Sequence, residues 1–131
     1  MKSFLSDAIL DLKLGLDGFL STVDGFNFEL KYKVLYFISK SERTSPKDLI
    51  DFFQMAKSNV ASMCAGLQKD GLIAKRMRTG SGKEIYYMIT KKGEAEVVRQ
   101  KQALESVFGK EELEQCSDLA QRLGAALRGR F

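Results

Sequence analysis

The sequence predicts a mainly α-helical fold that carries one small β-hairpin. Apolar residues recur at spacings of three and four over most of the chain, and only residues 72–89 change to a strand-like pattern. The 131 residues also contain a single Pro, a residue that breaks a helix when it falls inside one. The chain is long enough for one domain with its own core and too short for two ordinary domains.

Two helices are expected before residue 40. Residues 4–23 carry a wide apolar stripe made of Leu5, Ala8, Ile9, Leu12, Leu16, Phe19, Leu20 and Val23. Asp24 and Gly25 end this helix, and residues 28–39 form the next one. The apolar run at 34–38 is also compatible with a strand, but the length of the segment and its charged neighbours favour a helix.

A helix-turn-helix is predicted from residue 45 onward. Ser45 suits the cap of a helix, Pro46 suits its first position, and Asp48 completes a capping box. This short helix ends near Phe53, and a second helix begins at about Ala56. The second helix has one apolar face, made of Val60, Met63, Cys64 and Leu67.

The residues after this pair of helices predict a β-hairpin. Asp70 and Gly71 end the second helix, because Gly readily adopts the left-handed conformation of a helix end. Strands are expected at 72–78 and 84–89, and the glycines and serine at 79–83 form the tip between them. A helix-turn-helix followed by a basic hairpin is the layout of a winged helix-turn-helix.

Two further helices complete the chain. Thr90 caps a helix over about 91–108, which Gly109 ends, and a last helix runs over about 110–127. The last helix has an apolar seam made of Leu113, Cys116, Ala120, Leu123 and Leu127. A winged helix requires neither these two helices nor the first one. They pack either on their own domain or on a partner, and we expect an identical chain as the partner.

The positive charge of the chain is concentrated in its middle. The net charge is +4, and residues 40–90 contain nine basic and five acidic residues, so the flanks together are neutral. Four of the basic residues fall between Lys75 and Lys83 without an intervening acid. This distribution is typical of a polyanion-binding module, although a solvated basic face gives the same pattern.

The composition argues against several classes of function. The chain has no His, the commonest general base and metal ligand, and no nucleophile–base pair stands out. We therefore expect no enzyme, no cofactor and no metal site. Two distant Cys residues form no disulfide framework, and no segment has the length and apolarity of a membrane span or the pattern of a signal peptide. A cytoplasmic protein without a membrane partner is expected.

The order of the elements and two motifs resemble the MarR family of dimeric winged-helix transcription regulators. The segment 45–73 (SPKDLIDFFQMAKSNVASMCAGLQKDGLI) resembles the family's helix-turn-helix with its closing glycine-leucine-isoleucine. The segment 89–93 (ITKKG) resembles the entry to the family's dimerisation helix. PadR-type regulators share the second motif but begin almost directly with the winged helix, so the helix at 4–23 favours the MarR-like interpretation.

Three departures from the family pattern concern the reading of DNA. Ala56 stands at the start of the second helix, where the family usually has a serine, and Ser62 stands where it often has an arginine. The wing at 78–83 is short and reads RTGSGK, without the family's aspartate and paired arginines. The fold prediction is unaffected, but the resemblance does not imply which DNA sequence is read.

The outward face of the second helix supplies the candidate base-reading residues, which are Lys57, Ser58, Asn59, Ala61 and Ser62. The Asn59 amide suits adenine and the Ala61 methyl suits thymine, but most of these groups are small. We therefore expect modest base readout, supplemented by DNA shape. Candidate phosphate or minor-groove contacts are Arg76, Arg78, Ser81 and Lys83 on the wing, and Ser45 and Lys47 at the start of the first helix of the pair. Each of these six is alternatively an ordinary solvated side chain.

Two other groups of residues have competing interpretations. Cys64 lies in the recognition helix, but its helical phase places it in the core, which argues against a redox switch. Many aromatic residues surround the second and third helices, namely Phe26, Phe28, Tyr32, Tyr36, Phe37, Phe52 and Phe53. They are expected to be core residues. The resemblance also implies that a small aromatic effector binds between the dimerisation helices and the DNA-binding part, at residues that the sequence does not identify.

The sequence thus predicts one MarR-like domain over 1–131, with a winged-helix lobe at about 28–90 and dimerisation helices at about 1–24 and 91–131. The function it favours is a dimeric transcriptional repressor that binds double-stranded DNA at a pseudo-palindromic operator. The alternative is a winged helix that binds another protein and makes no contact with DNA.

Overall fold

The computed structural model describes the chain except residues 1–3, 27, 78–83, 108–109 and 129–131. Its elements follow the predicted order, which is α1 (Phe4–Leu20), α2 (Leu30–Ser39), α3 (Pro46–Phe53), α4 (Lys57–Lys69), β1 (Ile73–Met77), β2 (Ile85–Ile89), α5 (Lys91–Glu105) and α6 (Lys110–Arg128). The mainly helical fold with one hairpin is confirmed.

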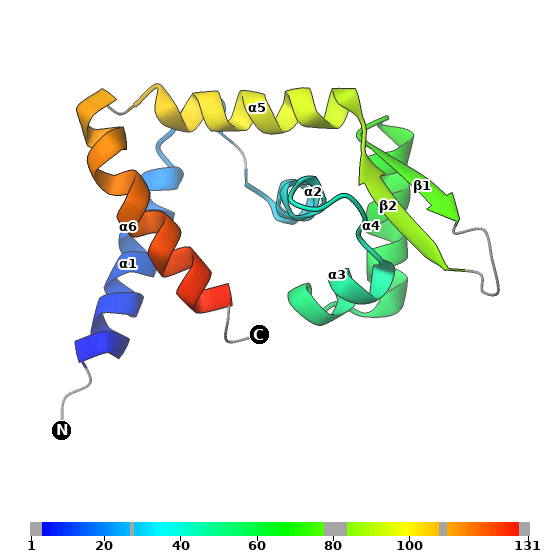
Figure 1. Ribbon diagram of the computed structural model, residues 1–131, viewed down its shortest axis with the longest axis horizontal. Helices are drawn as coiled ribbons and strands as arrows, with labels where there is room; N and C mark the ends of the chain where they lie inside the picture. The colour runs from blue at the N-terminus through cyan, green and yellow to red at the C-terminus, as the bar shows by residue number, and fades with distance from the viewer. Residues whose placement is uncertain (1–3, 27, 78–83, 108–109, 129–131) are drawn as a thin grey trace.

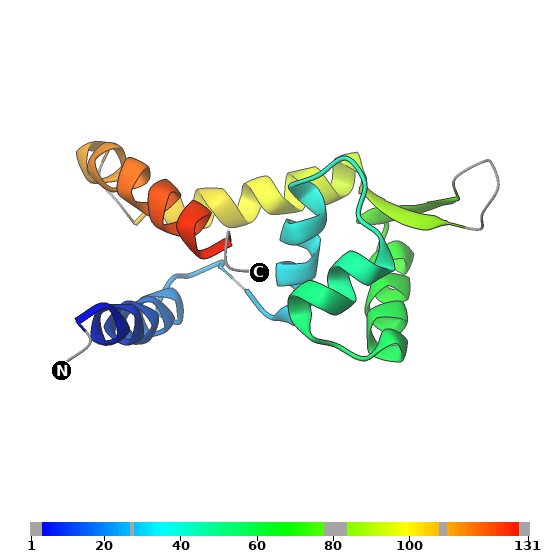
Figure 2. The ribbon, with the colours of Figure 1, turned by 60° about the horizontal axis from the view of Figure 1, so that its bottom comes forward.

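The molecule divides into a packed lobe and two helices that lie apart from it, at the far end of α5. The lobe consists of α2, α3, α4, the hairpin and the start of α5 (Figure 1). Helix α5 runs from the lobe to the other end of the molecule, where α1 and α6 lie, and Figure 2 shows the same separation. We refer to α1 and α6 as the arms.

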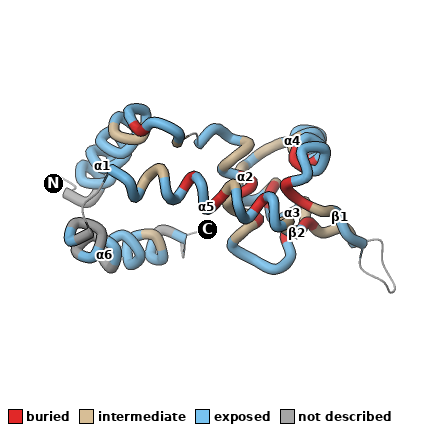
Figure 3. Tube along the Cα trace, turned by 90° about the horizontal axis from the view of Figure 1, so that it is seen from above, coloured by how far each residue is buried: buried red, intermediate tan, exposed pale blue. Residues whose placement is uncertain are grey.

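The core belongs to the lobe. Its buried residues come from α2, α3, α4, the hairpin and the first half of α5, and they are Val34, Leu35, Ile38, Leu49, Val60, Cys64, Leu67, Leu72, Ile73, Tyr87 and Val97. In Figure 3 the buried segments cluster in the lobe, whereas most of the described length of the arms is exposed. On α1, Leu10 and Leu14 are 61% and 72% exposed, and Leu12 and Leu16 are about half exposed.

The helix-turn-helix forms with the predicted boundaries. Ser45 caps α3, Pro46 is its first residue, and the capping box with Asp48 is complete. The turn to α4 begins at Gln54, a non-glycine residue in the left-handed conformation with φ of 54°. At the other end of α4, Gly71 has φ of 78°, as expected for the residue that ends this helix.

The hairpin strands pair antiparallel, with Ile73 opposite Ile89 and Met77 opposite Ile85. A third segment extends this sheet, because Thr44 pairs with Tyr87 through two backbone hydrogen bonds of 3.1 and 2.7 Å. Thr44 is almost completely buried. This bridge was not predicted, and it fixes the segment before α3 against the hairpin.

The junction between α4 and α5 explains the residues of the second motif. The Thr90 hydroxyl accepts the Gly93 N–H as the cap of α5 and donates to the Gly71 carbonyl at 2.6 Å. A Cβ at Gly93 would lie 2.1 Å from the carbonyl oxygen of Leu72. Only Gly fits where α5 crosses the end of α4, so the two helices are joined by direct backbone packing.

Several predicted boundaries were wrong by a few residues. Helix α1 ends at Leu20 instead of residue 23, α2 begins at Leu30 instead of residue 28, and α5 ends at Glu105 instead of residue 108. The helix predicted over 28–39 is confirmed against the strand alternative. In the described part of the chain, no helix is long and apolar enough to cross a membrane.

Candidate nucleic-acid interface

The outward face of α4 carries the five candidate base-reading residues. All five are exposed, namely Lys57, Ser58, Asn59, Ala61 and Ser62. The opposite face is buried through Val60, Cys64 and Leu67, each exposed by 1% or less, while Met63 is partly buried. The predicted orientation of the helix is therefore confirmed, and the contacts with bases remain a prediction.

The two helices of the helix-turn-helix differ at their N-termini. At α3 the Ser45 hydroxyl accepts the Asp48 N–H at 3.1 Å, and the Asp48 carboxylate accepts the Ser45 N–H at 2.9 Å. This carboxylate disfavours a second anion at the start of α3. At α4 the cap is Ala56, whose side chain makes no capping hydrogen bond. The first N–H groups of α4 are therefore better placed than those of α3 to bind a phosphate.

The remaining candidates lie in the same lobe. Ser45 is partly buried in its capping box, whereas Lys47 and Arg76 are exposed. The Arg76 guanidinium donates to the neighbouring Lys75 carbonyl at 3.2 Å. The other three wing candidates, Arg78, Ser81 and Lys83, lie outside the described residues, so the structure does not place them.

Cys64 is a core residue, as its helical phase predicted. Burial raises the pKa of its thiol. The Tyr87 hydroxyl is hydrogen-bonded to this thiol, and burial raises the pKa of Tyr87 to about 12. A buried thiol with a raised pKa is a poor nucleophile. The side chain of Cys116 lies outside those that the structure describes.

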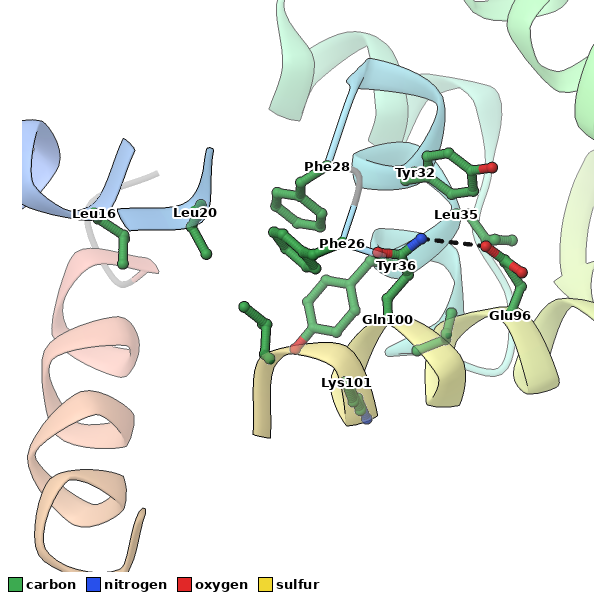
Figure 4. A pocket seen from close by; sticks show the side chains of 12 residues that line it. Leu16, Leu20, Phe26, Phe28, Tyr32, Leu35, Tyr36, Glu96, Gln100 and Lys101 are labelled. Carbon is green, nitrogen blue, oxygen red and sulfur yellow. Dashed lines mark hydrogen bonds between the residues drawn. The ribbon is translucent and has the colours of Figure 1, made fainter. Parts of the chain in front are cut away.

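An apolar pocket of about 330 Å³ lies between α1, α2 and α5 (Figure 4). Its apolar and aromatic lining comprises Leu16, Leu20, Phe26, Phe28, Tyr32, Leu35, Tyr36, Val97 and Leu104. Four of the aromatic residues that we expected in the core therefore line a pocket. Tyr32 and Tyr36 also pack against the core, as predicted, whereas Phe28 is 39% exposed. Helical spacing gives the direction of a side chain and not the distance between the elements around it, so the pocket was not predicted.

The other three aromatic residues form a second cluster at the end of α3. The rings of Phe37, Phe52 and Phe53 have centroids 4.6 to 5.5 Å apart. Phe52 is 39% exposed and the other two are partly buried, so this cluster lies at the edge of the core.

A charged network holds one wall of the pocket. Arg99 donates to the Glu96 carboxylate at 2.6 Å and to the Gly25 carbonyl at 3.1 Å, which ties the α1–α2 connection to α5. The hydrogen bond from Arg99 holds the pKa of Glu96 below its usual value. Gln100 donates to the same carboxylate at 3.2 Å, as the dashed line in Figure 4 shows. The Glu96 charge is thus satisfied by protein groups.

A second hollow, of about 440 Å³, opens beside the outward face of α4. Asn59 and Ser62 line it together with residues from the start of α2, including Leu30 and Lys31. The Lys31 ammonium lies 2.6 Å from the Asp70 carboxylate and holds the pKa of that carboxyl below its usual value. No sequence pattern marks this hollow, because it depends on how α2 crosses α4.

Metal-binding groups are not assembled in the part of the chain that the structure describes. No group of three or more His, Cys, Asp or Glu side chains there is placed to hold a metal ion.

The chain is similar to known proteins in its structure and not in its sequence. No family model matches the sequence, and no curated protein matches it. A mutant of MepR from S. aureus superposes with a TM-score of 0.71 at 14% identity, over 97% of this chain and 99% of that one. Wild-type MarR from E. coli superposes with a TM-score of 0.61 at 16% identity, over 94% and 98% of the two chains. A MarR-like transcriptional regulator from Thermotoga maritima gives 0.60 at 20% identity, over 98% and 99%.

The elements and their order define a winged helix-turn-helix protein with helical arms at both ends. The three superpositions cover nearly the whole of each chain, so they include the arms as well as the lobe. The chain therefore has the fold of the MarR-type transcription regulators, as the sequence motifs predicted.

Proposed function

We propose that the chain is a homodimeric, DNA-binding transcription regulator that acts as a repressor. The observation that carries the proposal is the exposed polar face of α4, presented by a packed winged-helix lobe beside the basic strand β1. Residues 28–90 then form the DNA-binding lobe, and 1–24 and 91–131 form the dimerisation helices. The proposal assigns the chain no catalytic role and places it in the cytoplasm with its DNA.

The arms support the dimeric part of the proposal. Large apolar side chains on the stripe of α1 are exposed in the isolated chain, including Ile9, Leu12 and Leu16. On α6, Leu123 is 37% exposed. Apolar surface of this kind is expected to be buried between two copies of the chain. Ala120 of the seam is also exposed, and the side chains of Leu113, Cys116 and Leu127 lie outside those described.

In the proposed complex each protomer places the start of α4 in a major groove. Asn59 pairs with adenine, Ala61 contacts a thymine methyl, and Lys57 meets a phosphate or a guanine. Two-fold symmetry then requires a pseudo-palindromic operator whose half-sites lie about one helical turn apart. Because the reading groups are small, DNA shape contributes to sequence preference.

The pocket between α1, α2 and α5 is proposed to bind a small apolar effector. Its volume of about 330 Å³ is near the lower end of the range for small-molecule sites. It lies between one arm and the lobe, so an occupant that fits one arrangement of these parts better than another shifts their equilibrium. Repression would be relieved by this shift.

The test is a salt titration of binding to the DNA upstream of the protein's own gene, with random DNA as the comparison. A regulator binds its operator more tightly than random DNA, and the logarithm of its affinity falls steeply with the logarithm of salt. Equal affinity for both DNAs at physiological salt would contradict the proposal. That result would favour the alternative, a winged helix that binds another protein.

A further inference from the structure

Arg43 is held against an aromatic ring on the outer face of the hairpin. Its guanidinium carbon lies 4.9 Å from the centroid of the Tyr86 ring. Arg43 is exposed and Tyr86 is partly buried. Within the described residues Arg43 has no ion pair, even though Glu42 is its neighbour in sequence. The charge of Arg43 is therefore available to a group outside the protein, while its side chain is already positioned by the ring.

The backbone beneath Arg43 is fixed on both sides. The Ser41 hydroxyl donates to the Arg43 carbonyl at 3.0 Å. The next residue, Thr44, exchanges two backbone hydrogen bonds with Tyr87, and the one after it, Ser45, belongs to the capping box of α3. Little conformational entropy remains to be lost when Arg43 binds a ligand, because both its backbone and its side chain are already ordered.

Arg43 lies between two of the candidate phosphate contacts named from the sequence, Lys47 and Arg76. It precedes Ser45, the cap of α3, by two residues, and Lys47 follows on the first turn of that helix. Its ring partner Tyr86 is the cross-strand neighbour of Arg76, so the side chains of Tyr86 and Arg76 point to the same face of the hairpin. Arg43 thus lies between the start of α3 and the wing.

The surroundings favour a phosphate that approaches from outside over an anion enclosed by the protein. Arg43 and Tyr86 line an open hollow whose other charged side chains are those of Lys40, Glu42 and Glu94. The two carboxylates offset the two cations, so the hollow itself does not attract an enclosed anion. A guanidinium that stacks on a ring still presents the N–H groups at its edge, and these match two oxygens of a phosphodiester.

We propose that Arg43, held by Tyr86, contacts a DNA phosphate and joins Lys47 on the first turn of α3 to Arg76 on strand β1 in one continuous strip of cations that binds the DNA backbone. The inference rests on the proposed function, since it adds a contact to the same complex. The contact orients the lobe on the duplex and carries no sequence preference.

The experiment measures the affinity of the full-length protein for a labelled random duplex and for the operator candidate over a series of salt concentrations. Arg43→Ala is expected to weaken both by about five- to tenfold and to reduce the slope of log affinity against log salt by about one per protomer that contacts DNA. Arg43→Lys keeps the charge without the planar fork of the guanidinium. Its affinity for DNA should fall between those of the wild type and Arg43→Ala. Tyr86→Phe should match the wild type, whereas Tyr86→Leu should resemble Arg43→Lys.

Lys33→Ala is the matched control, because Lys33 on α2 is also an exposed cation beside an aromatic ring, that of Phe28 just before the helix. Its salt slope should equal that of the wild type. Thermal unfolding checks that the Tyr86 variants remain folded. If Arg43→Ala keeps the wild-type slope, or changes affinity no more than Lys33→Ala does, the inference is wrong while the regulator proposal stands. If the wild-type protein shows no salt-dependent binding to DNA, both are wrong.

Discussion

The lobe and the arms have similarly amphipathic sequences but bury their apolar residues to very different extents. In the lobe, Leu35, Ile38 and Leu67 are exposed by 1% or less. On arm α1, the stripe residues Ile9, Leu12 and Leu16 are 37% to 47% exposed, although α1 is longer and more apolar than α2 or α4. An apolar stripe alone therefore shows that a helix needs a partner, and the structure shows which helices find one within their own chain.

The difference comes from how each part is connected to its neighbours. The lobe is closed by backbone contacts between segments far apart in sequence, such as the bridge between Thr44 and Tyr87 and the packing of Gly93 on Leu72. The described part of α6 follows α5 without such a contact to the lobe, and α1 approaches it mainly through Leu16 and Leu20 at the pocket. The lobe is expected to fold within one chain and the arms to depend on a second one.

The largest effect is expected at the junction that closes the lobe. Gly93→Ala introduces a Cβ that would lie 2.1 Å from the Leu72 carbonyl oxygen, so α5 must move away from the end of α4. We expect a loss of about 3 kcal/mol or more in the free energy of unfolding. Thermal unfolding followed by circular dichroism measures it. The control is Gly15→Ala on α1, where no atom lies within 4 Å of the added Cβ and the lobe should keep its stability. Equal melting temperatures for the two variants would contradict the distinction between lobe and arms.

The next effect concerns the arms. Leu12 belongs to the predicted apolar stripe of α1, whereas Leu14 lies off it and is 72% exposed. Leu12→Glu buries a charge in the proposed dimer interface and should weaken the dimer at least tenfold, by about 1.4 kcal/mol or more. Light scattering after size-exclusion chromatography over a range of concentrations gives the oligomeric state. Leu14→Glu should leave a dimer. A protein that is monomeric before mutation, or a Leu12→Glu variant that stays as dimeric as Leu14→Glu, would show that α1 has another role.

The sequence was sufficient for the parts of the lobe that local signals determine. The capping box of Ser45 and Asp48 and the left-handed Gly71 depend on a few neighbouring residues, and both are found where predicted. The phase of α4 followed from its apolar spacing, which correctly buried Cys64. Such features are predictable because local backbone preference and the core select the same conformation.

Features that depend on distances between elements were not predictable. The bridge of Thr44 to Tyr87 joins two single residues from distant segments, and no periodicity marks it. The pocket lies where α1, α2 and α5 leave space between them, so Tyr32 and Tyr36 line it on one side while they pack against the core on the other. For the same reason the stacking of Arg43 on Tyr86 could not be read from the sequence.

Within the lobe, α4 and the wing should respond differently to mutation. Asn59→Ala removes a group proposed to pair with a base, so it should change the base preference at that operator position. The binding free energy for the preferred sequence should fall by about 1–3 kcal/mol. Arg76→Ala should weaken binding to all sequences alike. Binding to a library of randomised duplexes measures both effects. Gln68→Ala is the control, since Gln68 is an exposed amide on the last turns of α4, beyond the reading residues. If Asn59→Ala keeps the sequence preference of the wild type, another turn of α4 must lie in the groove.

The smallest effect at neutral pH is expected where the hairpin meets α4. Burial raises the pKa of Tyr87 to about 12 from an unfolded value of 10.0, so between these pH values the unfolded chain loses the proton that the folded chain keeps. The wild-type protein therefore loses stability as pH rises above 10, by about 3 kcal/mol at most from this group. Tyr87→Phe removes the hydrogen bond to Cys64 and should cost about 1 kcal/mol at neutral pH. Because phenylalanine does not ionise, the difference between the two proteins should shrink above pH 10. Denaturant unfolding at a series of pH values tests this, and a difference that stays constant up to pH 12 would mean that the Tyr87 hydroxyl reaches solvent in the folded lobe.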